Sequence, residues 1–349
     1  MPPTAAGATQ HEPPSLDEEE SSVNPLPTSY RQHQIRSIDP EEYQASINLI
    51  KAIEDPDGFV IGRVRNCRAM ARFVRHVDTG HVRVLSYSCR HRWCPLCSRA
   101  KAYRISLNVF HWVKTLRSPK LITLTLKHSA APLKQQIDVL VRSFKRLRQH
   151  RELRRRIRGG IWFLQVTHNA ENGEWHPHLH VVADCLYIAQ RYLSQQWAAV
   201  TMTSKIVDIR SIRDPQYAAN YVSRYVAKPC KLADLDPIQR IDLAESLRAV
   251  RMYNTFGSAH KAGLLSRPVY DPRVWKSVGD FSIVAALAPQ DDTAMSIWRA
   301  WRDGTPLPDG LSCQPLTNEI NGYGVPPPDP AETGSAELDP YLPFERTTQ

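Results

Sequence analysis

The central part of the chain, from about residue 120 to residue 230, switches between the two-residue apolar period of a strand and the longer period of a helix. Alternation with threonine over Leu121–Leu126 predicts a strand, and further strands are expected at Ile161–Thr167 and His178–Val182. Apolar residues at helical spacing over Leu133–Arg158 predict a helix that stops at Gly159-Gly160. Strands interleaved with helices indicate a sheet covered by helices on at least one face.

Two shorter helices are expected beyond these strands, and the two ends of the chain differ from the middle. One helix should begin at Asp214 or Pro215 and end before Pro229, and another should run from Pro237 to Met252. The ends are rich in proline, small polar and acidic residues, which bury too little apolar surface to offset the entropy of ordering. We therefore expect a disordered arm over 1–45, a cysteine-rich segment over 46–110, a main domain over 111–260, a helical or irregular extension over 261–317 and a disordered tail over 318–349.

Composition adds a charge and a compartment to this picture. The 349 residues include 45 lysines and arginines against 35 acidic residues, for a net charge of +10, and this surplus favours a polyanionic partner such as nucleic acid. No N-terminal apolar region resembles a secretory signal, and no apolar run approaches the roughly 18 residues of a membrane helix. We therefore expect a cytoplasmic protein without a membrane partner, whose seven cysteines favour metal binding over disulfides.

Three histidines stand at alternate positions in the third predicted strand. His176, His178 and His180 should point to the same side, roughly 7 Å apart from one to the next, so that two of them can share one divalent ion. Pro177 disturbs the strand beside the first of them. Neutral imidazole suits Zn, Mn, Ni or Co, and a site that mixes imidazole with carboxamide tolerates Mg. The alternative is a set of hydrogen-bonded or surface histidines.

The helix expected before Pro229 carries two tyrosines. Tyr221 and Tyr225 are four residues apart and therefore lie on one helix face, which they share with Lys228. A phenol with a pKa of about 10 is a poor nucleophile. A nearby cation, such as Lys228 or Arg224, and a metal that polarises a phosphate make its attack feasible. The alternative is an amphipathic helix that buries its aromatic rings.

The cysteine-rich segment has the spacing of a zinc site. Cys94 and Cys97 form a Cys-x-x-Cys pair, Cys89 stands five residues before it, and Cys67 lies 22 residues further upstream. Four thiolates would make a closed tetrahedral site for Zn²⁺, with His91 as the alternative fourth ligand. Buried free cysteines are the other interpretation.

Positive charge concentrates on the helix expected over 133–158. A charge run is usually a solvated helix face, but beside a nucleic-acid site it favours contact with the DNA backbone, which gives affinity and salt dependence rather than sequence choice. The DNA-contacting residues that we expect here and on the tyrosine helix are Arg146, Arg148, Arg151, Arg155 and Arg224.

The histidine strand and the tyrosine helix together resemble a known family. His178–Ala183 looks like the His-hydrophobic-His motif of HUH endonucleases, and Tyr221–Lys228 resembles the two-tyrosine motif of the rolling-circle replication initiators of small phages and plasmids. Leu121–Thr125 sits where that family has its first strand. Trp175–His178 matches the Trp-His-Pro-His of plasmid initiators, and Cys89–Cys97 is similar to their cysteine block.

This resemblance, which covers residues 67–229, implies an α+β fold with a central antiparallel sheet flanked by helices and an N-terminal zinc-binding segment. It also implies that Mg²⁺ or Mn²⁺, held by His178 and His180, binds the scissile phosphate of single-stranded origin DNA. A tyrosine would then attack, leaving a 5′-phosphotyrosine and a free 3′-OH. Single-tyrosine plasmid relatives resemble the residues around Tyr225, which makes Tyr225 the expected first nucleophile and Tyr221 the second.

One departure from the family concerns the third metal ligand. Plasmid relatives often have glutamate where Gln165 stands. A carboxamide offers an oxygen ligand but no charge, so Gln165 and His176 are both candidates.

Two other functions fit parts of the pattern. A two-tyrosine HUH transposase carries a similar zinc block and tyrosine helix, whereas a zinc-containing DNA-binding protein without catalysis needs neither the histidine pair nor the tyrosines. The sequence has no Walker-type phosphate loop, so we expect a host helicase and DNA polymerase as partners besides single-stranded and origin DNA.

Overall fold

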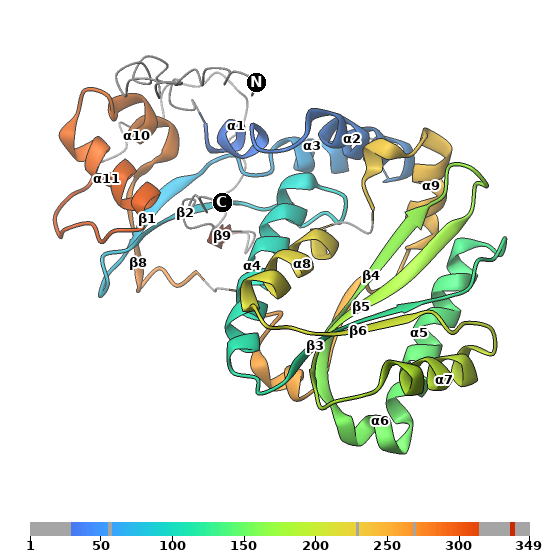
Figure 1. Cartoon of the computed structure of the whole chain (residues 1–349). Helices are drawn as coiled ribbons and strands as arrows, with labels where there is room; N and C mark the ends of the chain where they lie inside the picture. The colour runs from blue at the N-terminus through green and yellow to red at the C-terminus, as the bar shows by residue number, and fades with distance from the viewer. Residues whose placement is uncertain (1–28, 55–57, 228–229, 268–269, 314–335, 339–349) are drawn as a thin grey trace, which may run out of the picture.

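The computed structural model describes residues 29–54, 58–227, 230–267, 270–313 and 336–338, which form two antiparallel sheets with helices packed around them (Figure 1). The strands are β1 (Arg72–His76), β2 (Val82–Tyr87), β3 (Pro119–Thr125), β4 (Ile157–His168), β5 (Trp175–Cys185), β6 (Val207–Ser211), β7 (Tyr253–Gly257), β8 (Trp275–Asp280) and β9 (Ala336–Leu338). The α-helices are α1 (Tyr30–Ile35), α2 (Pro40–Glu54), α3 (Phe59–Arg65), α4 (Pro95–Lys114), α5 (Leu133–Gln149), α6 (Arg151–Arg156), α7 (Gln190–Thr201), α8 (Pro215–Ala227), α9 (Pro237–Ser246), α10 (Phe281–Leu287) and α11 (Asp292–Asp303), with 3₁₀ turns at Leu232–Asp234 and Ser258–Ala262.

The larger sheet has the strand order β6-β3-β5-β4-β7, and each neighbouring pair is antiparallel. The central strand is β5, which pairs with β3 on one side and with β4 on the other. The expected α+β fold with a central antiparallel sheet flanked by helices is therefore confirmed. The sheet carries the predicted histidine strand at its centre, where both neighbours fix its register.

The two faces of this sheet pack against different helices (Figure 1). Leu179 and Val181 of β5 belong to the core that includes apolar residues of α5 and α7. Val182, on the opposite face, packs in a second core with residues of α4 and α8. Because side chains alternate along a strand, His178 and His180 lie on the face that Val182 shares, on the side of α4 and α8.

The predicted helix over 133–158 is interrupted, and the two glycines do not end it. Helix α5 stops at Gln149, α6 follows for one and a half turns, and Gly159 and Gly160 lie inside β4. A Cβ on Gly159 would come within 2.3 Å of the amide nitrogen of Ser258, and one on Gly160 within 2.6 Å of the carbonyl oxygen of Val182. The glycines therefore serve close backbone approach between strands rather than helix termination.

The smaller sheet, with the order β8-β1-β2-β9, joins segments from both halves of the chain. Its core combines Phe73 of β1 with Phe281 of α10 and Trp298 of α11. The cysteine-rich segment and the C-terminal extension are thus parts of one folded unit, which the sequence did not predict because strand pairing over such a distance leaves no local pattern.

The chain ends are also more ordered than expected within the described residues. Helices α1 and α2 lie inside the segment predicted as a disordered arm over 1–45, and β9 lies inside the predicted tail over 318–349. Tyr30 explains the first difference, since its ring is 2% exposed and packs 5.1 Å from that of Phe281. Among the described helices, none combines the length and apolar character needed to cross a bilayer.

Candidate functional site: the histidine strand, the tyrosine helix and the cysteine cluster

The two central histidines of β5 are surrounded by hydroxyl and carboxamide groups of the neighbouring strands. His178 lies between Thr125 of β3, 3.1 Å from its Nδ1, and Thr167 of β4, 3.2 Å from its Nε2. His180 has Thr123 of β3 3.2 Å from its Nδ1. These threonines were not predicted as site residues, although the alternation of Leu121–Leu126 already put them on one face of a strand.

His180 also joins the strand to helix α8. Its Nε2 lies 2.6 Å from Oε1 of Gln165, and its Nδ1 lies 2.7 Å from the hydroxyl of Tyr221. A carboxamide oxygen only accepts hydrogen bonds, so Nε2 carries the hydrogen and Nδ1 accepts the hydroxyl hydrogen of Tyr221. The ring of Tyr221 meets the imidazole edge-on, with the centroids 5.2 Å apart.

Burial keeps both imidazoles in the form that binds metals. Burial, and then the charge of His178, lowers the pKa of His180 to about 4. Burial, followed by the charges of His176 and His128, lowers the pKa of His178 to about 4 as well. Both rings are therefore neutral at pH 7, and a neutral imidazole is the ligand form.

The donor set around His180 fits a divalent ion. Oε1 of Gln165 and Nε2 of His180 are neighbours at 2.6 Å, close to the roughly 3 Å that separates adjacent ligands with bonds of about 2.1 Å. The rings of His178 and His180 have their centroids 6.4 Å apart, at the upper end of the roughly 6.5 Å that two imidazoles on one ion allow. Of the two candidates for the third ligand, Gln165 is the one beside His180.

His176 lies with other residues. Its ring centroid is 3.9 Å from that of His128, in the connection between β3 and α5. His128, Glu174 and His176 each offer one ligand atom, and these atoms all lie within 4.8 Å of one another. His128 and Glu174 were not singled out in the sequence, because an isolated histidine and a hairpin glutamate carry no pattern.

The tyrosine helix begins as the sequence predicts. The side chain of Asp214 accepts a hydrogen bond of 2.9 Å from the amide of Gln216, and Pro215 supplies the first helical residue. Tyr221 turns toward the sheet and Arg224 is exposed to solvent. The side chain of Tyr225 and the whole of Lys228 lie outside the described part of the chain.

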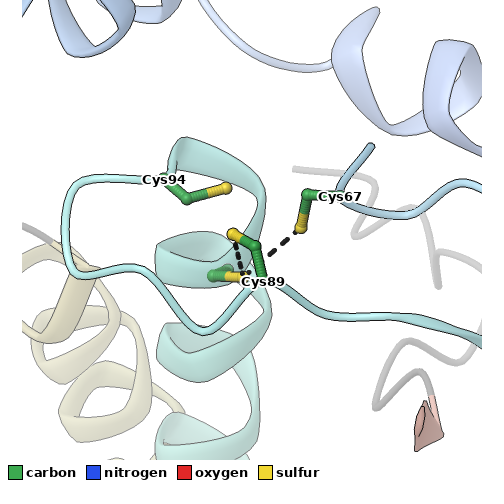
Figure 2. A group of neighbouring side chains, drawn as sticks. Cys67, Cys89 and Cys94 are labelled. Atoms are coloured by element: carbon green, nitrogen blue, oxygen red, sulfur yellow. Dashed lines mark hydrogen bonds between the residues drawn. The ribbon is translucent and has the colours of Figure 1, made fainter. Parts of the chain in front are cut away.

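The predicted cysteine site is brought together. The Sγ atoms of Cys67, Cys89, Cys94 and Cys97 all lie within 4.8 Å of one another, and Figure 2 shows the first three side chains converging on one small space. Cys97 lies 3.4 Å from Cys67 and 3.5 Å from Cys89, near the roughly 3.8 Å between thiolates on a tetrahedral ion with bonds of about 2.3 Å. This cluster could therefore hold a metal ion.

Backbone and electrostatics both prepare this cluster. Arg68 and Arg90, each directly after a cysteine, have φ angles of 65° and 55°, so the chain turns sharply behind Cys67 and Cys89. Hydrogen bonds from the other thiols, Cys67 first, lower the pKa of Cys97, which favours the thiolate that binds metals. His91, the alternative fourth ligand, instead accepts a hydrogen bond from the amide of Trp93 at 3.3 Å.

The basic helices lie on the other face of the sheet. Helices α5 and α6 pack against the side of Leu179 and Val181, away from the histidines. Arg146, Arg151 and Arg155 of these helices are exposed, whereas Arg224 of α8 belongs to the histidine side.

Arg148 differs from the other basic residues. Its guanidinium lies 5.0 Å from the ring centroid of Phe144 and 4.5 Å from that of Phe256, at a cavity of about 270 Å³. Trp162 and Leu179 also line this cavity, so it belongs to the face opposite the histidines.

Comparison with known proteins gives a consistent result. A family model described as "Replication protein" matches residues 84–265, more than half of the chain. The chain is similar to "Protein rep" of Streptococcus pneumoniae, with 29% identity over 197 residues, which cover 50% of this chain and 61% of that protein. It is also similar to "Protein rep" of Bacillus amyloliquefaciens, with 26% identity over 171 residues, 43% of this chain and 49% of that protein.

A third relative, "Protein rep" of Lactiplantibacillus plantarum, is 24% identical over 208 residues, 56% of this chain and 62% of that protein. The chain thus spans less than two thirds of the length of each of these curated relatives. No solved structure matches it. The resemblance of its motifs to plasmid rolling-circle replication initiators is confirmed. Because the matched region includes three of the four clustered cysteines, the histidine strand and the tyrosine helix, the chain belongs to the replication protein family.

Proposed function

We propose that this chain initiates rolling-circle DNA replication by nicking, and later rejoining, single-stranded origin DNA through a tyrosine of α8. The observation that carries the proposal is the hydrogen bond of 2.7 Å between the hydroxyl of Tyr221 and Nδ1 of His180. It joins a potential nucleophile to a potential metal ligand, which a purely structural aromatic helix does not require.

The reaction needs only the phenol and the DNA strand as reactants. The tyrosine oxygen attacks the scissile phosphorus, a bond from phosphorus to that oxygen forms, and the bond to the 3′ oxygen of the preceding nucleotide breaks. The phenol proton is lost to the surroundings and the departing oxygen gains one, leaving a free 3′-OH and a 5′-phosphotyrosine. The new ester keeps the energy of the phosphodiester, so the reverse attack by a 3′-OH rejoins strands without ATP.

The side chains around His180 hold the reactants in this scheme. His180 accepts the hydrogen of Tyr221 through Nδ1, while Gln165 holds the other ring nitrogen and so fixes the orientation of the imidazole. Tyr225, one helical turn further on, remains our proposal for the first nucleophile, with Tyr221 taking the strand at termination. Lys228 would lower the cost of forming a phenolate on that face.

The proposed cofactors differ between the two sites. His178, His180 and Gln165 would hold Mg²⁺ or Mn²⁺, which when bound supplies Lewis-acid polarisation of the scissile phosphate. The four clustered cysteines would hold a structural Zn²⁺, because four thiolates close the coordination shell. The sites are built from separate side chains, so each should load without the other.

The relatives support replication over the transposase alternative, since the similar curated proteins carry the name "Protein rep". We propose that the chain acts in the cytoplasm on origin DNA and that a host helicase and DNA polymerase extend the free 3′-OH. Exposed arginines, Arg224 nearest the histidine side, would hold the DNA backbone.

The proposal is tested by incubating the full chain with a single-stranded origin oligonucleotide and Mn²⁺ and resolving covalent adducts on a denaturing gel. We expect an adduct with the wild type and with Tyr217→Phe, an exposed tyrosine of the same helix that serves as the matched control. Tyr221→Phe with Tyr225→Phe should abolish the adduct. His178→Ala with His180→Ala should abolish nicking while the zinc content stays unchanged. An adduct that survives the double tyrosine variant would overturn the mechanism.

A further inference from the structure

A second group of potential metal ligands lies at the end of the histidine strand. His128 comes from the connection between β3 and α5, Glu174 precedes β5 in the turn that follows β4, and His176 lies near the start of β5. Their ligand atoms all lie within 4.8 Å of one another. The group therefore joins two connections that are far apart in the sequence.

The spacing within this group is that of ligands rather than of hydrogen-bonded partners. Nδ1 of His128 and Oε2 of Glu174 are 3.6 Å apart, too far for a hydrogen bond. Two ligands with bonds of about 2.1 Å to a tetrahedral ion are separated by about 3.4 Å. An ion between them would thus require almost no movement of either side chain.

His176 adds an independent observation. Its Nε2 is buried and has no hydrogen-bond partner among the described residues. A buried nitrogen without a partner costs stability, and coordination to an ion satisfies its lone pair without a hydrogen bond. Two strands away from solvent on either side, this nitrogen has the ring of His128 as its near neighbour, with centroids 3.9 Å apart.

We propose that His128, Glu174 and His176 bind a second divalent ion of the zinc class, separate from the ion proposed at His178 and His180. Two imidazoles and one carboxylate form a borderline donor set that prefers Zn²⁺, Co²⁺ or Ni²⁺ over Mg²⁺. Three protein ligands leave one coordination position open, in contrast to the closed set of four cysteines.

The separation from the neighbouring site follows from the strand. His176 and His178 are two residues apart on one face, which places them roughly 7 Å from each other. Both ring nitrogens of His178 already meet hydroxyls of Thr125 and Thr167. His176 is then a ligand of the outer site, and Gln165 is left as the third ligand of the inner one.

The outer site is accessible, since the side chain of His128 is 63% exposed and that of Glu174 is 24% exposed. An ion there would tie the connection before α5 to the turn between β4 and β5, at the rim of the histidine face. Its open position could take water or a phosphate oxygen of a bound strand. Ion binding itself needs no nicking activity, so the inference does not depend on the proposed function.

The test is a Zn²⁺ titration of the full chain, with the tightly held zinc of the cysteine cluster left in place. Metal content by mass spectrometry and the affinity by competition with a chromophoric chelator give the number of sites. We expect one exchangeable zinc in the wild type that is lost in His128→Ala and weakened at least tenfold in Glu174→Gln. His150→Ala, at an exposed histidine between α5 and α6, is the matched control and should bind like the wild type.

Unchanged zinc affinity in both His128→Ala and Glu174→Gln would overturn the inference. So would equal loss in the His150→Ala control, because it would show unspecific histidine binding. Nicking in Mg²⁺ is measured in parallel to separate the two proposals. Zinc binding that depends on His128, in a chain that forms no DNA adduct, would overturn only the proposed function. Adduct formation without the exchangeable zinc would overturn only the outer site.

Discussion

At the scale of single residues, the chemistry of the site lies in contacts that no spacing rule contains. The alternation of His176, His178 and His180 predicted a common face, and the structure has that face. It did not predict that Gln165 rather than His176 would lie 2.6 Å from Nε2 of His180. The cross-strand register of β4 and β5 decides this, because Gln165 is paired with His178 and its long side chain reaches the next histidine.

Gln165 provides the first prediction. Gln165→Glu adds a negative charge next to His178 and His180, and a hard carboxylate binds Mg²⁺ better than a carboxamide does. We expect the Mg²⁺ concentration for half-maximal nicking to fall about tenfold, or about 1.4 kcal/mol. Gln165→Leu, which has no ligand atom, should raise it. The prediction is wrong if the glutamate variant needs as much Mg²⁺ as the wild type.

The buried histidines also predict a dependence of stability on pH. The pKa values of His178 and His180 are lowered to about 4, so the unfolded chain binds more protons than the folded chain between pH 6.5 and 4. The free energy of unfolding should therefore fall as the pH drops through this window, by about 1 kcal/mol for each histidine at pH 5.5. Urea titrations at pH 7.5 and 5.5 measure it. His178→Gln with His180→Gln should flatten the difference, and an equal slope in that variant would contradict the assignment.

At the scale of elements, periodicity predicted the strands and helices around the site, and its failures have identifiable causes. Strands β3, β4 and β5 and helix α8 lie where the pattern put them, within a few residues. Gly159-Gly160 was interpreted as a helix stop because glycine usually ends helices, but here it allows β4 to approach its neighbours closely. That reason depends on residues nearly a hundred positions away, at Ser258, and is invisible locally.

These glycines give a prediction for the sheet. In Gly159→Ala the new Cβ would meet the backbone at Ser258 at 2.3 Å, so β7 has to move away from β4. We expect a loss of about 1 to 3 kcal/mol in the free energy of unfolding. Gly62→Ala, in helix α3 with nothing within 4 Å of the added atom, is the control and should be neutral or stabilising. Equal urea midpoints for the two variants would argue against the close approach.

At the scale of the whole molecule, the cysteine cluster lies where the smaller sheet meets helix α4, and α4 in turn packs on the histidine face. The sequence indicated both sites but not the sheet that connects the cysteine-rich segment with the C-terminal extension. Long-range pairing of β1 with β8 fixes that arrangement. Charge is also divided at this scale, with the basic helices α5 and α6 on one side of the sheet and Arg224 on the other.

This division predicts how salt affects DNA binding. Each arginine that contacts a phosphate of single-stranded DNA contributes about 0.7 to the slope of log affinity against log salt concentration. Arg224→Ala should reduce the slope by about this amount for an oligonucleotide that fills only the nicking site. Arg146→Ala and Arg151→Ala should reduce it only for DNA long enough to reach the far face. Arg158→Ala, which removes a partner of Asp184 3.2 Å away, is the control, and a uniform effect of all four would contradict the division.

The most direct test of the central claim is identification of the amino acid that carries the DNA. The wild-type chain is reacted with a single-stranded origin oligonucleotide and Mn²⁺, digested with nuclease and protease, and analysed by mass spectrometry. The account predicts a 5′-nucleotide on a tyrosine of α8, at Tyr225 or Tyr221, with release of a free 3′-OH. A cleaved strand with no modified tyrosine, or with the modification outside α8, would contradict it.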